Sequence, residues 1–301
     1  MELIVGTNRF LIHLVINDDF EIIDKFFLGI DHYYGAGLEN NGAHFYAKRG
    51  NANFNIIEYY KRNEEGKYSL FGIRYFPDSY ASVHQIARWK NGVVVANTAF
   101  NSVGYFDFDK KEHIQYFIND AQNDINHVNS VFPCGDNRVH AMMHNRNRKS
   151  ELMELKLTKN NFHLERVIEL SHKGCHNIFI SGDTLMYNAS RFGYFIMTNI
   201  NNIKNSTRVE FSGQHTKGLS ISEKYIIVGH SDLAVRKVRD KSNGYISFID
   251  RNSLTLLKTI DLSSSGKLGH PLGNFPVGNV NEVRVLMEKD YGHSMEAALT
   301  D

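Results

Sequence analysis

His127-Val-Asn-Ser-Val131 recurs late in the chain as Asn279-Val-Asn-Glu-Val283, with asparagine in place of the histidine. The same position opens three other short apolar segments, which begin at His84, His176 and His215. Successive histidines in this series are 43, 49 and 39 residues apart. A period of about 40 to 50 residues is typical of the four-stranded blades of a β-propeller. The repeat therefore predicts an all-β propeller.

Each of these segments is followed by a turn and a second strand that ends in polar residues, as at Asn97-Thr98 and His144-Asn145. A weaker copy begins at Tyr34. The copy that begins at Asn279 is too close to the end of the chain to complete a blade, whereas Leu3–Thr7 and the strands after it lack a first strand. We therefore expect the N-terminal strands to complete the last blade, which removes exposed sheet edges.

This closure gives six blades, and five remain possible if the first copy is not a true blade. No linker, low-complexity stretch or block of like charge divides the chain, which contains only four prolines. Residues 1–301 are therefore expected to form one domain, with 289–301 as a short C-terminal tail.

The composition excludes several classes of protein. The 34 basic and 33 acidic side chains nearly balance, so no overall field favours nucleic acid or an anionic membrane. No apolar run approaches the length of a membrane span. The N-terminus has no signal-peptide pattern, and the two cysteines fit a reducing compartment. We expect a cytoplasmic protein that binds a small molecule, and the sequence gives no oligomeric state.

The histidines that open the first strands are the candidate functional residues. Antiparallel neighbours reverse direction, so the start of each first strand and the end of each second strand lie at the same mouth of the channel. Imidazoles from several blades can ligate a transition metal through their neutral ring nitrogens. The predicted ligands are His84, His127, His176 and His215, with iron favoured and manganese, zinc and copper as alternatives.

The remaining polar residues at this mouth are predicted to contact the substrate. Tyr34 and Asn279 take the position of the histidine in the two weaker copies, and Glu282 is a candidate general base. The candidate substrate-binding residues are Arg49, Asn97, His144, Asn145, Asn188, Arg191, His230 and Arg236. The same histidines could instead form a metal-free polar site or serve only to hold neighbouring blades together.

The repeat pattern resembles that of the six-bladed propellers of the gluconolactonase and NHL kind. Members related to the lactonases bind calcium through carboxylates and asparagine, so the ring of His84, His127, His176 and His215 departs from their chemistry. A four-histidine ring looks more like that of the carotenoid-cleaving oxygenases, which are longer propellers that hold non-haem iron.

The resemblance and the histidine ring together favour a metal-dependent enzyme, with a non-haem iron oxidoreductase or oxygenase acting on a small neutral or anionic molecule as the first hypothesis. A metal-dependent lyase or isomerase is the second hypothesis. A non-catalytic propeller that binds a protein or a carbohydrate is the third.

Overall fold

Short strands rich in valine, isoleucine and aromatic residues alternate with tight turns, and each group of four strands forms one antiparallel sheet. The computed structural model describes residues 1–38, 44–49, 55–64, 66–119, 123–135, 137–263 and 276–286, without the side chains of 44–49, Asn55 and Arg236. Within these residues the strands form six four-stranded sheets. In one of these sheets the structure describes only the backbone of the strand β5 (His44–Arg49).

The strands of the first three sheets in chain order are β1 Glu2–Thr7, β2 Phe10–Ile16 and β3 Ile22–Ile30; β4 His32–Leu38, β5 His44–Arg49, β6 Asn55–Arg62 and β7 Tyr68–Tyr75; and β8 Val83–Trp89, β9 Gly92–Asn97, β10 Ser102–Asp107 and β11 His113–Phe117.

The strands of the other sheets are β12 Val128–Cys134, β13 Arg138–Met143, β14 Glu151–Thr158 and β15 Asn161–Glu169; β16 Cys175–Ser181, β17 Thr184–Ala189, β18 Tyr194–Asn199 and β19 Asn202–Glu210; and β20 Gln214–Ile221, β21 Tyr225–Asp232, β22 Gly244–Asp250 and β23 Leu256–Asp261, with β24 Val280–Val285 joining β1. Two short 3-10 helices, η1 Ser190–Phe192 and η2 Arg236–Lys241, lie in connections.

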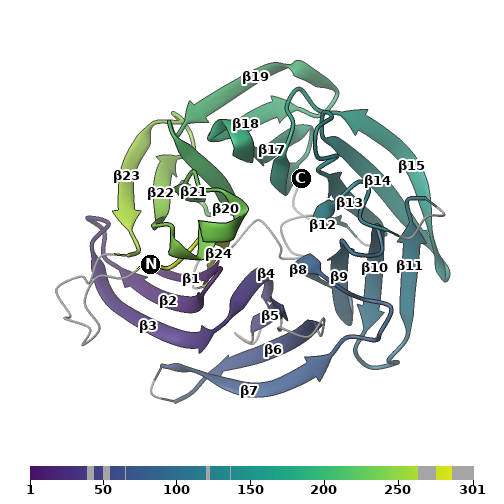
Figure 1. Ribbon diagram of the computed structural model, residues 1–301, viewed down its shortest axis with the longest axis horizontal. Helices are drawn as coiled ribbons and strands as arrows, with labels where there is room; N and C mark the ends of the chain where they lie inside the picture. The colour runs from purple at the N-terminus through teal and green to yellow at the C-terminus, as the bar shows by residue number, and fades with distance from the viewer. Residues whose placement is uncertain are drawn as a thin grey trace.

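The sheets are arranged around a central axis, as Figure 1 shows. The first strand of each sheet is innermost and contacts the first strands of the neighbouring sheets, from β4 through β8, β12, β16 and β20 to β24 and back to β4. The fourth strands form the rim of the ring (Figure 1). The prediction of an all-β propeller is therefore confirmed.

The two ends of the described chain meet in one sheet, in the order β24-β1-β2-β3. Leu3 pairs with Val285 and Val5 pairs with Val283. The N-terminal strand thus supplies the second strand of the sheet that β24 begins, which is the closure expected from the incomplete repeats at the two ends. The predicted tail, 289–301, lies outside the described residues.

The core lies between the sheets. Trp89 of β8 is fully buried, packs edge-to-face on Tyr105 of β10 and stacks on Phe162 of β15 in the next sheet. Its indole N–H donates a hydrogen bond of 3.0 Å to the carbonyl of Gly135. Inner strands are covered on both faces in this way, which explains the continuous apolar run Val93–Ala96, whose residues are all buried.

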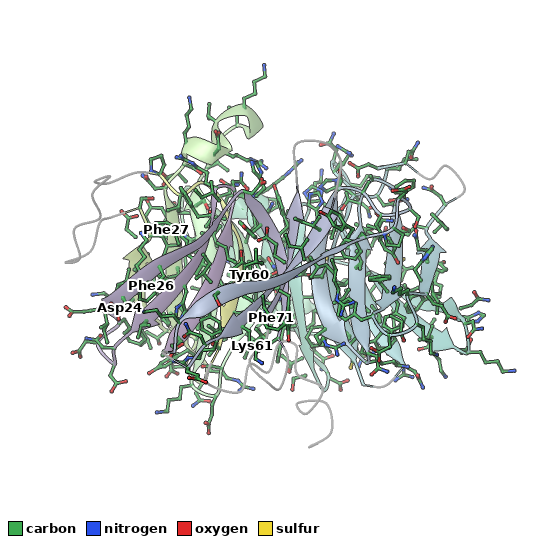
Figure 2. All side chains as sticks on the ribbon, turned by 90° about the horizontal axis from the view of Figure 1, so that it is seen from below. Asp24, Phe26, Phe27, Tyr60, Lys61 and Phe71 are labelled. Atoms are coloured by element: carbon green, nitrogen blue, oxygen red, sulfur yellow. The ribbon has the colours of Figure 1, made fainter. Side chains whose placement is uncertain are left out.

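The outer strands are more exposed than the inner ones. Figure 2 shows Phe26 on β3 and Phe71 on β7, which are 38% and 69% exposed. No helix in the described part of the chain has the length and hydropathy needed to cross a membrane.

Candidate functional site

A cavity of about 730 Å³ opens at one mouth of the channel. The innermost strands and the residues that immediately precede them provide much of its wall, and Arg239 of η2 lies over its edge. Figure 2 shows the η2 segment, in the light green of the β21–β22 connection, projecting from one end of the ring. The predicted site residues that line this cavity are Tyr34, His84, His127, His144, His176, Arg191, His215 and Asn279.

Five imidazoles from four sheets form a continuous row along the wall. Each ring contacts the next edge-to-face, with interplanar angles of 72° to 76°. The distances between ring centroids are 4.7 Å for His84–His127, 5.3 Å for His127–His144, 5.1 Å for His144–His176 and 6.0 Å for His176–His215. The row is thus an arc that follows the mouth and includes His144, which comes from the end of a second strand.

β-Bulges turn the inner strands close to these residues. The pairing of β8 with β9 shifts between Val83 and Gln85, so His84 is the extra residue, and the pairing of β16 with β17 shifts between His176 and Ile178. A bulge leaves one residue without a partner and changes the direction of its side chain. His127, which precedes β12, has a φ of 54°, a backbone conformation that is uncommon outside glycine.

Cationic side chains surround the imidazole row. Arg146, Arg191, Lys217 and Arg239 line the cavity, and its described lining includes no aspartate or glutamate. Lys217 is only 8% exposed. Arg146 donates to the carboxylate of Asp124 at 2.6 Å, whereas Arg191 has no hydrogen bond or ion pair with any described residue. The cavity therefore has a net positive field.

The field and the burial keep the imidazoles neutral. Burial, with the charges of His127, Lys217, Arg191 and Arg146 as further causes, lowers the pKa of His144 to about 3. Burial and the nearby Lys217 ammonium hold the pKa values of His176 and His215 well below the usual value for histidine. Each of these rings is expected to be uncharged at pH 7 while the cavity contains no anion.

The arrangement does not fit a single metal ion shared by the four predicted ligands. The described residues contain no group of three or more His, Cys, Asp or Glu side chains placed to hold one. His144 lies between His127 and His176, and its Nδ1 accepts a hydrogen bond of 3.0 Å from the backbone N–H of Arg146, so its Nε2 carries the hydrogen in the neutral ring. The cationic lining would also repel a dication, so the predicted iron centre is unsupported.

Glu282, the candidate general base, lies outside the cavity lining. Its carboxylate is 2.6 Å from the guanidinium of Arg284 and accepts a hydrogen bond of 2.9 Å from Gln85. Glu282 and Arg284 are 2% and 1% exposed. The carboxylate thus links the inner strands β24 and β8, which lie on either side of β4, and these contacts give Glu282 a structural role.

Four of the predicted substrate-binding residues are buried outside the cavity lining, and their side chains hydrogen-bond within the protein. Asn97 donates to the backbone carbonyl of Ser79 at 2.9 Å, and Asn145 donates to the Glu151 carboxylate at 2.6 Å. Asn188 donates a hydrogen bond of 3.0 Å to the carbonyl of Gly218, and Nε2 of His230 lies 2.8 Å from the hydroxyl oxygen of Ser247. Both residues are also buried. The side chains of Arg49 and Arg236 lie outside the described residues.

Several residues of the cavity were not predicted from the sequence. Lys217 stands inside the repeat that begins at His215, and a lysine within a buried inner strand is itself an informative signal. Asn281 occupies the bulge of β24, where Thr7 pairs with Val280 and Gly6 pairs with Glu282. The remaining lining residues are Asn8, His32, Arg146, Asn147, Leu233 and Arg239.

Comparisons with known proteins identify the fold and no family. No family model and no curated protein matches the sequence. Solved structures match over nearly the whole chain at low identity. A chain of a nidogen–laminin complex matches with a TM-score of 0.65 and 9% identity, covering 95% of this chain and 98% of that one. A protein of unknown function from Bacteroides caccae matches with a TM-score of 0.64 and 11% identity, covering 95% of this chain and 99% of that one.

A third match is a Bacteroides fragilis protein that carries a provisional name as a 6-phosphogluconolactonase. Its TM-score is 0.56 at 11% identity, and the match covers 94% of this chain and 96% of that one. At these identities the likeness establishes the propeller fold alone.

Proposed function

We propose that this protein binds a small anionic molecule at the mouth of its propeller channel. The observation that carries the proposal is the lining itself: Arg146, Arg191, Lys217 and Arg239 with six histidines, and no acidic residue among the described lining positions. Guanidinium and ammonium groups bind carboxylates and phosphates through charge-assisted hydrogen bonds. We take each four-stranded sheet as one blade, so that all six blades contribute to the mouth.

The remaining lining residues suit a polar ligand of small size. Tyr34 and Asn279 belong to the cavity wall, and we propose that both face the ligand. The side chain of Asn279 also lies 2.9 Å from the hydroxyl oxygen of Ser242, which fixes its place in the wall.

The test is calorimetric titration with 6-phosphogluconate and with inorganic phosphate. The first probe is chosen because it carries both a phosphate and a carboxylate and because it is related to the activity that one structural neighbour is named for. We expect binding that weakens as salt concentration rises. Arg191→Gln should raise Kd roughly 10- to 100-fold, since a hydrogen bond to a charged group contributes about 1.5 to 3 kcal/mol.

Lys258→Gln is the matched control, because Lys258 is an exposed cation on the outer strand β23. Its Kd should equal that of the unmodified protein. The proposal fails if neither anion binds at millimolar concentration, or if Arg191→Gln and Lys258→Gln change Kd equally.

A second candidate function, acid–base catalysis on the bound anion, is favoured by one pair of residues. The Nδ1 of His127 lies 2.9 Å and 3.1 Å from the two carboxylate oxygens of Asp124. A carboxylate in this position fixes the ring so that Nε2 faces the reacting group, as in hydrolytic enzymes that use a histidine base. His127 lines the cavity, and no described residue hydrogen-bonds its Nε2.

The corresponding reaction would be the opening of an anionic lactone. Water would lose a proton to Nε2 of His127 while its oxygen bonds to the carbonyl carbon, the ring C–O bond would break, and the proton would pass to the departing oxygen. We expect the protein to accelerate opening of 6-phosphogluconolactone, and His127→Gln and Asp124→Asn to lower kcat by roughly 100-fold or more. A lactone that opens no faster with protein than without it rejects this second function.

A further inference from the structure

The cavity wall contains hydrogen-bond acceptors as well as cationic side chains. His176 is anchored at Nδ1, which lies 3.2 Å from the carbonyl oxygen of Gly174 and 2.7 Å from the hydroxyl oxygen of Ser190. A carbonyl oxygen can only accept, so Nδ1 carries the hydrogen. The other nitrogen of the neutral ring, Nε2, is therefore an acceptor, and no described residue donates to it.

His215 presents a second acceptor of the same kind. Its ring hydrogen-bonds the backbone of Ser190, a contact that raises the pKa of His215 against the larger lowering caused by burial. The contact therefore uses a ring N–H as donor. The Nε2 atom is buried and has no hydrogen-bond partner, and the residue as a whole is 6% exposed. The centroids of His176 and His215 are 6.0 Å apart on the cavity wall.

Asn281 provides a third acceptor from the bulge of β24. Its Nδ2 donates to the side-chain oxygen of Asn8 at 2.9 Å and to the carbonyl oxygen of Tyr33 at 3.1 Å. Both amide hydrogens are thereby used, and the contact with a carbonyl fixes the orientation of the amide. The Oδ1 atom is buried without a partner, and Asn281 is 7% exposed and lines the cavity.

Two of these three acceptors, Nε2 of His215 and Oδ1 of Asn281, are buried without a partner and require hydrogen-bond donors, since buried polar atoms are normally satisfied. The donor on a ligand could be an ammonium, an N–H group or a hydroxyl. The cationic side chains of Arg191, Lys217 and Arg239 in the same wall disfavour an ammonium. Hydroxyl groups are neutral, and one molecule can carry several of them next to an anionic group.

We propose that the ligand of this cavity is a polyhydroxylated anion, a sugar acid or a sugar phosphate, whose hydroxyls donate hydrogen bonds to His176, His215 and Asn281. This inference rests on the proposed anion-binding function and names the substrate class of the same site. The cations hold the anionic group, and the acceptors select for the hydroxylated chain.

The experiment compares ligands of equal charge with and without hydroxyls, by calorimetric titration of the full chain. Gluconate is paired with hexanoate to test the carboxylate, and sorbitol 6-phosphate is paired with hexyl phosphate to test the phosphate. In at least one pair the hydroxylated ligand should bind about 10-fold tighter or more, because a site with unpaired acceptors discriminates against an analogue that lacks the matching donor. The pair that shows the preference identifies the anionic group.

His215→Phe removes the Nε2 acceptor and keeps a flat ring, and Asn281→Leu removes the amide. Each should reduce the preference to about threefold or less. His113→Phe is the matched control, because His113 is exposed on the outer strand β11, and it should keep the full preference. Circular dichroism and thermal unfolding check the fold of each variant.

The outcomes separate this inference from the proposed function. Equal binding of hydroxylated and alkyl ligands in both pairs would overturn the polyhydroxylated ligand and leave anion binding intact. Binding of none of the four ligands would overturn both. A full preference that persists in folded His215→Phe and Asn281→Leu would overturn the assignment of the acceptors. The comparison within the unmodified protein decides the ligand class even if a variant does not fold.

Discussion

The guanidinium of Arg284 is fully buried inside the ring, and it pairs there with the carboxylate of Glu282. Arg284 is 2.6 Å from Glu282 and donates to the backbone carbonyls of Leu219 and Val283 at 2.7 Å each. A buried charge that loses its partner is strongly destabilising. The pair therefore makes Glu282 necessary for stability, whether or not the cavity contains a ligand.

Removing this carboxylate gives the first prediction. Glu282→Ala should lower the free energy of unfolding by about 3 to 5 kcal/mol, because it removes the carboxylate that lies 2.6 Å from the buried guanidinium of Arg284. Urea denaturation measures the change. Glu223→Ala, at an exposed position next to β21, is the control and should change stability by less than about 0.5 kcal/mol. A Glu282→Ala protein of unchanged stability would contradict the structural role and return Glu282 to the list of catalytic candidates.

At the scale of single strands, bulges and glycines set the position of the cavity residues. The pairing of β20 with β21 shifts between Thr216 and Leu219, and Gly218 in this bulge has a φ of +79°. A Cβ atom there would lie 3.0 Å from the side chain of Val283 and 3.2 Å from the backbone of Glu282. Lys217, the preceding residue, lines the cavity, so the bulge links the conformation of β20 to the charge of the site.

The second prediction compares two glycines with a positive φ, of which only Gly218 has other atoms close to an added Cβ. Gly213→Ala and Gly218→Ala both place alanine at a positive φ, +71° and +79°, but Gly213 has no atom within 4 Å of the added Cβ. Gly213→Ala should cost about 1 kcal/mol, and Gly218→Ala should cost about 1 kcal/mol more and weaken anion binding. Equal losses of stability with unchanged binding would show that the bulge does not position Lys217.

The strands also explain what the sequence could predict. The spacing of His84, His127, His176 and His215 predicted correctly that these residues gather at one mouth, since equivalent positions of a repeat have equivalent places in a ring. The sequence did not predict which side chains at the ends of the second strands face the cavity. Asn97 was therefore expected at the mouth, whereas the structure buries it.

The bulges account for the residues that were missed. An extra residue in an inner strand changes which side chains face the channel, and it has no marker in the sequence unless the backbone requires glycine. Asn281 is aimed into the cavity wall by such a shift. The charge of the cavity was also hidden, because the basic residues that surround it are separated by long stretches of sequence and the balance over the whole chain is close to neutral.

Several histidines are buried and neutral in the folded protein, and they make its stability depend on pH. Burial lowers the pKa of His140 to about 4, that of His144 to about 3 and that of His230 to about 4. The pKa values of His176 and His215 are also well below the usual value. In the unfolded chain each imidazole has a pKa of about 6.5. Below that pH the unfolded state binds protons that the native state does not, so stability falls as the pH decreases.

The third prediction follows from this linkage. Each of these histidines should lower the free energy of unfolding by about 1.4 kcal/mol between pH 7.5 and pH 5.5, where the unfolded ring becomes charged and the native ring stays neutral. His230→Phe keeps an aromatic ring next to Phe211 and Tyr245, whose centroids lie 4.7 Å and 5.3 Å from that of His230, and removes one titrating group. Its loss of stability over this range should therefore be about 1.4 kcal/mol smaller than that of the unmodified protein.

Urea denaturation at the two pH values measures the difference, with His163→Phe, on the exposed face of the outer strand β15, as the control. Only the change between the two pH values is compared, so the intrinsic effect of each substitution on stability cancels. The histidines that line the cavity also lower the stability as the pH decreases, as long as no anion is bound. A bound anion next to Lys217 would favour protonation of His144, so saturating ligand should reduce the loss at pH 5.5. A protein equally stable at both pH values would show that the native state takes up as many protons over this range as the unfolded state does, which contradicts lowered pKa values for the buried imidazoles.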